Sequence, residues 1–125
     1  MQKWIVPTNV KNYDIVEHVK KDKILYFKKN RALQKGDIAY IYLAKPYAQI
    51  LFKAIVLADK VKSDELTYQS SVGNDKDKLY VKVEVVQCFD DGELLYDDLK
   101  KHGLSQVVNQ QLVRGDLEAY IASKE

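Results

Sequence analysis

The most regular alternation of apolar and polar positions runs through Leu79–Phe89 and predicts a half-buried β-strand. Val81, Val83 and Val85 fall on one face, whereas Lys82 and Glu84 fall on the other. Successive side chains of a strand point to opposite sides, so this alternation is typical of a sheet with one buried face. We expect the strand to end at the turn residues that follow, Asp90-Asp91-Gly92.

Two further strands are predicted in the middle of the chain. Ile38–Ala44 is rich in Ile and Tyr, which favour strands. Gln49–Ala58 is almost continuously apolar, as expected of a strand in the interior of a sheet, and Val61–Leu66 could prolong it. Pro46 and Tyr47 lie at a turn between the two strands, which therefore form a hairpin.

The N-terminal part of the chain predicts a short strand, a helix and a second apolar segment. Trp4-Ile5-Val6 is a strand that Pro7 is expected to stop. Apolar residues recur at helical spacing within Tyr13–Lys21, and Asn12 precedes them as a helix cap. The segment Ile24–Phe27 follows, before a basic loop.

The C-terminal part predicts short helices. Turn residues make Thr67–Lys78 a loop, Leu95–His102 is a short helix closed by Gly103, and Asp116–Ala122 forms the last helical turns. This order of elements indicates an α+β fold whose curved antiparallel sheet forms a pseudobarrel with short flanking helices. The strands are too closely linked for parallel crossover units. We expect one domain over residues 1–125.

The composition of the chain indicates its cellular location. The chain has no apolar run near the roughly 20 residues that a membrane helix needs and no signal-peptide pattern. It has one cysteine, so no intrachain disulfide can form. These features predict a cytoplasmic protein that contacts no membrane.

Charge is distributed unevenly along the chain. Residues 1–62 hold 13 Lys and Arg against 5 Asp and Glu, a net charge of +8, and residues 63–125 hold 7 against 13, a net charge of −6. A basic half can attract a phosphate backbone, or the two halves can simply be oppositely charged solvated faces. Lys outnumbers Arg by 18 to 2, which suits loose phosphate contact better than base-edge reading of duplex DNA.

The sequence lacks the residue patterns that zinc sites, phosphate-binding loops and nucleophilic catalysis require. One cysteine and two widely separated histidines, His18 and His102, give no zinc pattern, and the scattered glycines form no phosphate loop. No nucleophile turn is present, and Cys88 is expected to be a buried structural thiol. We therefore expect no cofactor, no metal and no catalytic residues.

Aromatic and basic residues interleave in the N-terminal half and suggest a base-binding site. Rings beside cations are the components of a nucleobase-stacking pocket with phosphate contacts. The same rings could instead belong to the core, and one face of the strand Ile38–Ala44 must do so. The residues in question are Trp4, Tyr26, Phe27, Tyr40, Tyr42 and Tyr47, interleaved with Lys28, Lys29, Arg31 and Lys45.

At these residues the chain resembles the EVE domain group of the PUA-like superfamily. The resemblance rests on Trp4-Ile5-Val6-Pro7, on 29–33 leading into Lys35-Gly36-Asp37, on 39–42 followed by the strand 50–56, and on Gly103-Leu104, Leu112, Leu117 and Tyr120-Ile121. It is the order of these elements that carries the resemblance. The related ASCH pattern Gly-x-Lys-x-x-Glu-x-Arg is absent, which counts against an ASCH-type hydrolase.

The resemblance implies a concave aromatic pocket that reads a modified base in DNA or RNA, in a fold similar to that of the YTH readers of methylated adenine. The resemblance implies that the pocket is lined by Trp4, Pro7 and Thr8, by 26–30 and by 42–45. Together with the aromatic and basic pattern, it leads us to expect ligand contacts from Trp4, Thr8, Tyr26, Asn30, Tyr42 and Tyr47, and phosphate contacts from Lys28, Lys29, Arg31 and Lys45. Asn30 and Thr8 would read the base edge. Where many relatives have a small hydroxyl residue, this chain has Ala44 and Lys45, so one polar contact is missing or altered.

Two alternatives remain open at this point. Oppositely charged halves could pair across a two-fold axis, which would make the chain a protein-interaction module or a homodimer that binds no nucleic acid. An enzyme would need Asp37 or Glu84 as a general base, and the sequence shows no partner residue for either.

Overall fold

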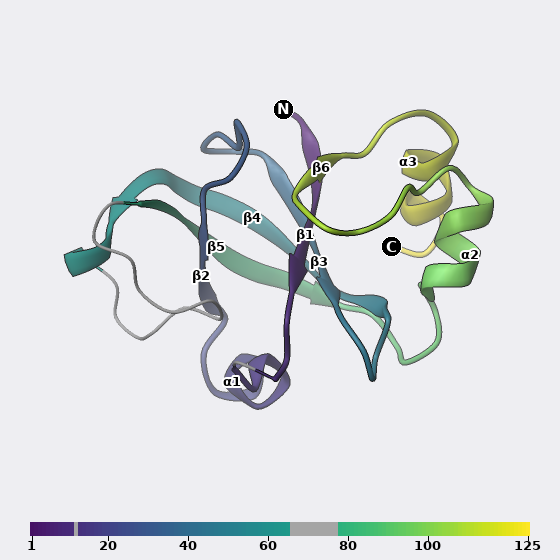
Figure 1. The fold of residues 1–125 in the computed structure, drawn as a ribbon, viewed down its shortest axis with the longest axis horizontal. Helices are drawn as coiled ribbons and strands as arrows, with labels where there is room; N and C mark the ends of the chain where they lie inside the picture. The colour runs from purple at the N-terminus through teal and green to yellow at the C-terminus, as the bar shows by residue number, and fades with distance from the viewer. Residues whose placement is uncertain (12, 66–77) are drawn as a thin grey trace.

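The strands form one curved, six-stranded mixed sheet whose two edges do not pair with each other, so the sheet is open and does not close into a barrel (Figure 1). The computed structural model describes residues 1–11, 13–65 and 78–125. Across the sheet the strand order is β2–β5–β4–β3–β1–β6. The strands are β1 (Lys3–Thr8), β2 (Ile24–Lys28), β3 (Ile38–Leu43), β4 (Gln49–Lys62), β5 (Leu79–Cys88) and β6 (Gln111–Leu112). The helices are α1 (Ile15–Lys21), the 3-10 turn η1 (Ser63–Glu65), α2 (Tyr96–Lys101) and α3 (Gly115–Ala122).

The predicted central strands and helices are confirmed, with small changes at their ends. β3 and β4 form the expected antiparallel hairpin, with Ile38 opposite Ile55. β4 runs without a break to Lys62 and so includes the first two residues of the predicted extension, after which Ser63–Glu65 form the 3-10 turn. The proposed cap Asn12 and most of the predicted loop 67–78 lie outside the described residues. Asp14 caps α1, since its side chain accepts a hydrogen bond from the Glu17 backbone N–H at 3.2 Å.

The prediction of a purely antiparallel sheet was wrong at one pair, because β1 and β3 are parallel and Trp4 lies opposite Ala39. Their connection, residues 9–37, contains α1 and β2 and is long enough for a crossover. Pro7 does not stop β1. It lies beyond the two positions at which β1 pairs with β6, where the strand has a free edge that tolerates proline.

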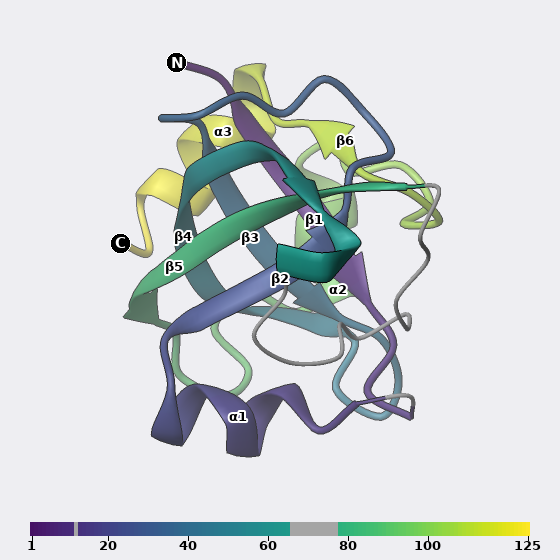
Figure 2. The same ribbon diagram turned by 90° about the vertical axis from the view of Figure 1, so that its left-hand side faces the viewer.

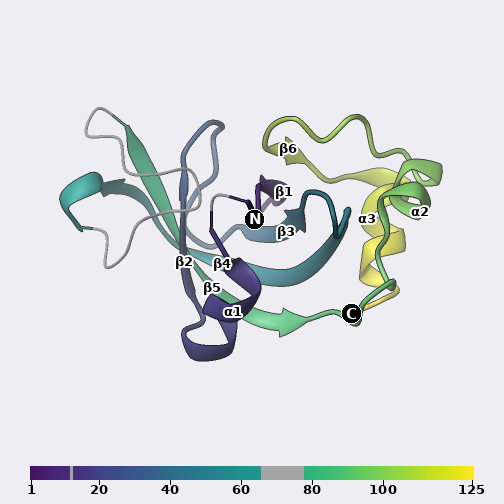
Figure 3. The same cartoon turned by 60° about the horizontal axis from the view of Figure 1, so that its bottom comes forward.

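Alternate residues of the sheet enter two separate cores. Val6 and Leu43 belong to the core that α1 covers, whereas Ile5 and Tyr40 belong to the core beneath α2 and α3. Figures 1 and 3 show α2 and α3 lying together at one end of the molecule, away from α1. Since both faces of the sheet are covered, all six residues of β3 are buried.

Glu125 holds the C-terminal residues against the core beneath α2 and α3. The buried Tyr40 hydroxyl donates to the Glu125 carboxylate at 2.7 Å, and Lys53 lies 3.2 Å from the same oxygen. Burial, followed by the Glu125 carboxylate, raises the pKa of Tyr40, so this hydroxyl stays protonated and continues to donate.

Two further expectations concern single features. Cys88 is exposed and not buried, because it shares the outward face of β5 with Glu84 and Val86. Among the described residues no helix is long and apolar enough to cross a membrane.

A single buried amide bridges the open side of the sheet between β2 and the segment before β6. Gln110 is 5% exposed, and its side chain donates to the Lys28 carbonyl at 2.7 Å and accepts from the Asn30 N–H at 3.2 Å. An amide carries both a donor and an acceptor, so it satisfies the end of β2 as a neighbouring strand would. We call this contact the Gln110 clasp.

Substituting Gln110 should destabilise the fold. Gln110→Leu leaves a backbone carbonyl and a backbone N–H without partners, which costs about 1–3 kcal/mol for each group that stays buried. We expect the free energy of unfolding in urea to fall by about that amount and amide exchange at Asn30 to accelerate. The exposed Gln106→Leu is the matched control. Equal stability of the two variants would contradict a structural role for the clasp.

Candidate functional site

The aromatic residues predicted to form one pocket lie in three different parts of the core. Trp4 is 4% exposed and packs in the core beneath α1, Tyr42 is 7% exposed and points to the opposite face of the sheet, and Tyr26 is 3% exposed in a small third cluster with Val61 and Tyr80. A base cannot stack on three rings that are buried and point in different directions. These three rings are therefore core residues, which is the second of the two interpretations that the sequence allowed.

Trp4 donates a hydrogen bond to the buried carboxylate of Asp37. Its indole N–H donates to Asp37 at 3.0 Å, and the Asp37 carboxylate also accepts the backbone N–H groups of Gln2 and Gln34, each at 3.0 Å. Burial alone raises the pKa of this carboxyl, but the three donors outweigh it and its pKa lies below the ordinary value. Asp37 therefore acts as an ionised structural acceptor and is poorly suited to act as a general base near neutral pH.

The remaining predicted residues divide between two ends of the molecule. β2 and β1 run in opposite directions along the sheet. Figures 1 and 2 show the loop after β2 on the same side as the N-terminus and β6, whereas α1 and the β3–β4 turn lie on the opposite side. Lys28, Lys29, Asn30 and Arg31 thus lie at one end, and Thr8, Lys45 and Tyr47 lie at the other.

Thr8 holds the most unusual polar group of the described structure. The residue is 3% exposed, and its hydroxyl has no hydrogen-bond partner among the residues that the structure describes. It lies at the end of β1, opposite Leu43 of β3, on the same face as Val6. Buried hydroxyl groups nearly always have a partner, so an unpartnered one is a group that a ligand could satisfy.

The β3–β4 turn lies directly against this position. The Thr8 carbonyl accepts the Ala44 N–H at 3.0 Å and thereby fixes the β3–β4 turn against β1. In that turn Lys45 is exposed and Tyr47 is half-buried against the core that Thr8 faces. Tyr13 packs against the same core from the start of α1. We call Thr8, Tyr13, Lys45 and Tyr47 the Thr8 site.

Sequence reasoning missed Tyr13 and Gln110. Tyr13 was assigned to a helix, although it precedes α1 and its hydroxyl hydrogen-bonds to His18. The ring of His18 also bonds to the Ile24 carbonyl at 2.8 Å, so this histidine is occupied. Gln110 gives no signal in the sequence, because its partners are about 80 residues away.

Within the described ranges no three His, Cys, Asp or Glu side chains gather as a metal site would require. The acidic residues after β5 instead support local structure: Asp91 accepts from the Gln49 amide at 2.6 Å, and Glu93 accepts from the Asp90 N–H at 3.1 Å.

Comparisons with known proteins identify the fold. No known family model matches the sequence, and no curated protein matches it. The structure is similar to that of the S128A mutant of the ASCH protein from Zymomonas mobilis, with a TM-score of 0.70 and 11% identity over 98% of this chain and 95% of that one. It is also similar to Rpa0253 from Rhodopseudomonas palustris, with a TM-score of 0.67 and 12% identity over 99% and 92%.

A YTH domain is a third structural neighbour. The Mmi1 YTH domain, determined in complex with RNA, has a TM-score of 0.65 and 14% identity over 98% of this chain and 76% of that one. The chain therefore has the PUA-like α+β fold of ASCH and YTH domains. The resemblance to the EVE group in particular stays a prediction.

Replacing Asp37 should give a pH-dependent loss of stability. Asp37→Asn cannot accept all three N–H groups, because one of its two side-chain atoms is now a donor, and we expect a loss of about 2–4 kcal/mol at pH 7. The lowered folded-state pKa contributes stability above the unfolded pKa of about 3.9 and loses it as the pH falls through the folded value. The difference between wild type and variant, measured by Trp4 fluorescence in urea from pH 7 to pH 2.5, should therefore shrink with acid. A difference that does not vary with pH would contradict this.

Replacing the Thr8 hydroxyl should make the protein more stable. Thr8→Val keeps the β-branched shape and removes a buried group without a partner, so we expect the free energy of unfolding to rise by about 1 kcal/mol. The converse change on the same strand face, Val6→Thr, should lower it. If Thr8→Val is destabilising by thermal denaturation, the hydroxyl has a partner and the site loses its main feature.

Proposed function

We propose that this chain is a non-catalytic nucleic-acid-binding module that accepts a modified base, unpaired or flipped out of its helix, at the Thr8 site. The observation that supports it most strongly is the buried Thr8 hydroxyl, which lacks a partner among the described residues. The fold is shared with a YTH domain that was crystallised with RNA, and this likeness supports nucleic acid as the ligand class.

The Thr8 site offers one polar contact in apolar surroundings. The hydroxyl can donate one hydrogen bond and accept two, which suits the edge of a base. Its neighbours on the same sheet face, Val6 and Leu43, are fully apolar. A base that carries a methyl group would fill such surroundings better than an unmodified one, because it buries additional apolar area.

Stacking would come from one predicted ring, Tyr47, and from Tyr13, which the sequence did not predict. Tyr13 and Tyr47 are the half-buried tyrosines of the site, whereas Trp4, Tyr26 and Tyr42 are committed to the core. A stacked base contributes roughly 1–3 kcal/mol, which is comparable to the cost of extruding a base from a helix and exceeds it when the base is already unpaired. Single-stranded nucleic acid is therefore the preferred form.

Phosphate contacts would come from both ends of the molecule. Lys45 flanks the Thr8 site, and Lys28, Lys29 and Arg31 lie at the far end. Within the described part of the chain none of these four side chains has an ion-pair partner, since the salt bridges there involve other cations. A free cation can neutralise a phosphate without first losing an intramolecular partner.

The proposal contains no chemical step. The two side chains suggested as general bases are placed otherwise, because Asp37 is buried with three donors and Glu84 points outward from β5. The cytoplasmic setting that the sequence predicts agrees with a nucleic-acid ligand.

The proposal is tested by fluorescence anisotropy with single-stranded oligonucleotides that carry methylated bases, beside unmodified and duplex controls. We expect one modified single strand to bind best, and binding to weaken with salt by a slope of about −0.7 per phosphate contact. Thr8→Val should weaken it about 10- to 100-fold, equivalent to about 1–3 kcal/mol, although this variant is expected to be the more stable protein.

Thr8→Ser, which keeps the hydroxyl, is the matched control and should retain most of the binding. If Thr8→Val binds as tightly as wild type, the Thr8 site is not the base site. If no oligonucleotide binds the folded protein, gel filtration at low and high salt tests the alternative, in which the oppositely charged halves of the chain mediate self-association.

A further inference from the structure

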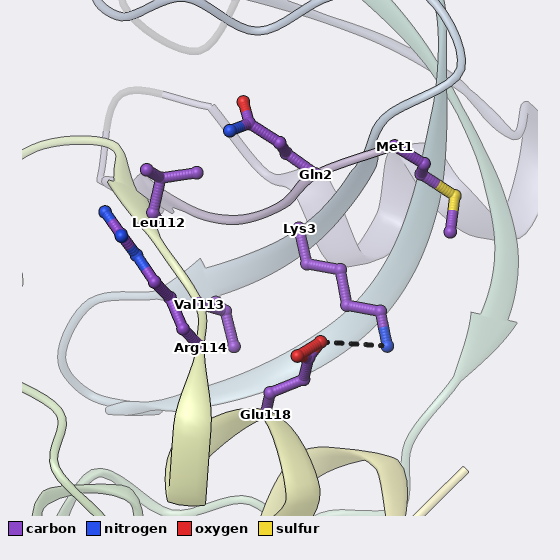
Figure 4. Close-up of a pocket in the computed structure, with 7 residues that line it drawn as sticks. All are labelled: Met1, Gln2, Lys3, Leu112, Val113, Arg114 and Glu118. Carbon is purple, nitrogen blue, oxygen red and sulfur yellow. Dashed lines mark ion pairs between the residues drawn. The ribbon is translucent and has the colours of Figure 1, made fainter.

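A pocket of about 320 Å³ lies at the end of the molecule opposite the Thr8 site (Figure 4). The start of β1, the end of β6 and α3 line it. Figure 4 shows two polar parts: Lys3 and Glu118 reach toward each other on one side, and the Arg114 side chain extends beside Leu112 on the other. We call this the Arg114 pocket.

Arg114 is an available cation in this pocket. It is exposed, and its guanidinium has no hydrogen-bond or ion-pair partner among the described residues. The Lys3 Nζ lies 3.8 Å from the Glu118 Oε2, so these two residues form a loose ion pair with no net charge. The fork of a guanidinium matches two oxygens of a phosphate or carboxylate group. The free charge in the pocket is thus positive and suited to an oxyanion.

The chain around the pocket carries few negative charges. Residues 24–36 hold four cations and no Asp or Glu, and residues 103–114 hold one cation and no Asp or Glu. The Gln110 clasp joins these two segments. Both arginines of the chain, Arg31 and Arg114, therefore lie on segments that the clasp holds together, although lysine is nine times more frequent.

Four carboxylates on or next to these segments have partners in the structure, and one of them is Asp116, two residues from Arg114, which lies 3.0 Å from His102. Asp37 is buried with three donors, Asp59 accepts the Lys35 backbone N–H at 3.0 Å, and Glu118 faces Lys3. Arg114 thus keeps a positive charge that no carboxylate of the described residues pairs, and an oxyanion such as a backbone phosphate can bind it.

β1 connects this pocket to the Thr8 site. The strand begins at Lys3, in the wall of the pocket, and ends at Thr8. Five steps of about 3.3 Å separate the two residues, roughly 17 Å. A nucleic-acid strand whose stacked nucleotides are 3.4 Å apart would cover that span in about five steps, which is about six nucleotides. An extended nucleic-acid strand would need fewer.

We propose that the Arg114 pocket binds a backbone phosphate of the same single strand whose modified base occupies the Thr8 site. The inference rests on the proposed function and adds to it a second, distant contact. Affinity then depends on strand length, because an oligonucleotide must reach from one end of β1 to the other before Arg114 contributes.

The test titrates wild type, Arg114→Gln and Thr8→Val with oligonucleotides of two, four, six and eight nucleotides that carry the preferred base at one end, in both polarities. For wild type we expect about tenfold tighter binding between two and six nucleotides, in one polarity. Arg114→Gln should remove this gain, lower the salt slope for the hexamer by about one, and leave the dinucleotide unaffected. Arg114→Lys should recover part of the gain, since it keeps the charge and loses the fork.

Lys100→Gln is the matched control, since it removes an exposed cation of α2, and it should bind as wild type does. The inference is overturned if Arg114→Gln binds the hexamer like wild type or weakens both lengths equally. In that case loss of binding by Thr8→Val at every length would show that the proposed function stands without it. Failure of wild type to bind any length would overturn both.

Discussion

The ionised carboxylate of Asp37 fixes the register on which the rest of the structure depends. It receives N–H groups from Gln2 and Trp4 at the start of β1 and from Gln34 in the loop before β3. β1 and β3 are parallel, so no hairpin turn can set their alignment. A slip of one residue would exchange the two faces of β1 and would move Trp4 and Thr8 from one core to the other. Because Asp37 holds the first residues of β1, it also determines that Thr8 lies opposite Leu43 at the far end.

Because both faces of the sheet are covered, the side chains of its central strand cannot contact a ligand. Every residue of β3 is buried, so the tyrosines that make this strand conspicuous fill space and hold α2 and α3, as Tyr40 does through Glu125. Few polar groups are left inside, and those with partners serve the fold: Gln110 satisfies the end of β2, and Asp37 satisfies β1. Thr8 is the exception among the described side chains. A protein that retains an unpaired hydroxyl sacrifices about 1–3 kcal/mol, and binding a ligand would offset that loss.

Sequence patterns identified the elements well, because alternation and helical spacing report which side of an element is buried. Leu79–Phe89 and the hairpin of Ile38–Ala44 with Gln49–Ala58 were predicted nearly to their ends. The parallel pairing of β1 was missed, since strand patterns carry no direction, and the two-residue strand β6 is too short to show a period. The candidate site was harder to predict, because a ring beside a lysine looks the same in sequence whether it faces solvent or core. Trp4, Tyr26 and Tyr42 were assigned to a pocket from their aromatic character and from a family resemblance, but all three are buried in the core. Thr8 was named through the resemblance and Lys45 through both arguments, and the structure brings these two residues to one end.

The contacts of Gln110 determine where the unevenly distributed charges of the chain lie in the structure. The Gln110 clasp places residues 103–113, which carry no Lys, Arg, Asp or Glu, against the basic loop after β2. Arg31 and Arg114 therefore lie on joined segments that lack the acidic residues of the rest of the second half of the sequence. Many of those acidic residues lie on α2, on α3 and in the turn before α2, at the end of the molecule away from α1 (Figures 1 and 3). A phosphate backbone would be repelled by α2 and by the turn before it, whereas at α3, which lines the Arg114 pocket, Glu118 faces Lys3. The same amide that closes the gap in the sheet thus also sets where a polyanion can approach, and this links the stability of the open sheet to the orientation of the strand that it is proposed to bind.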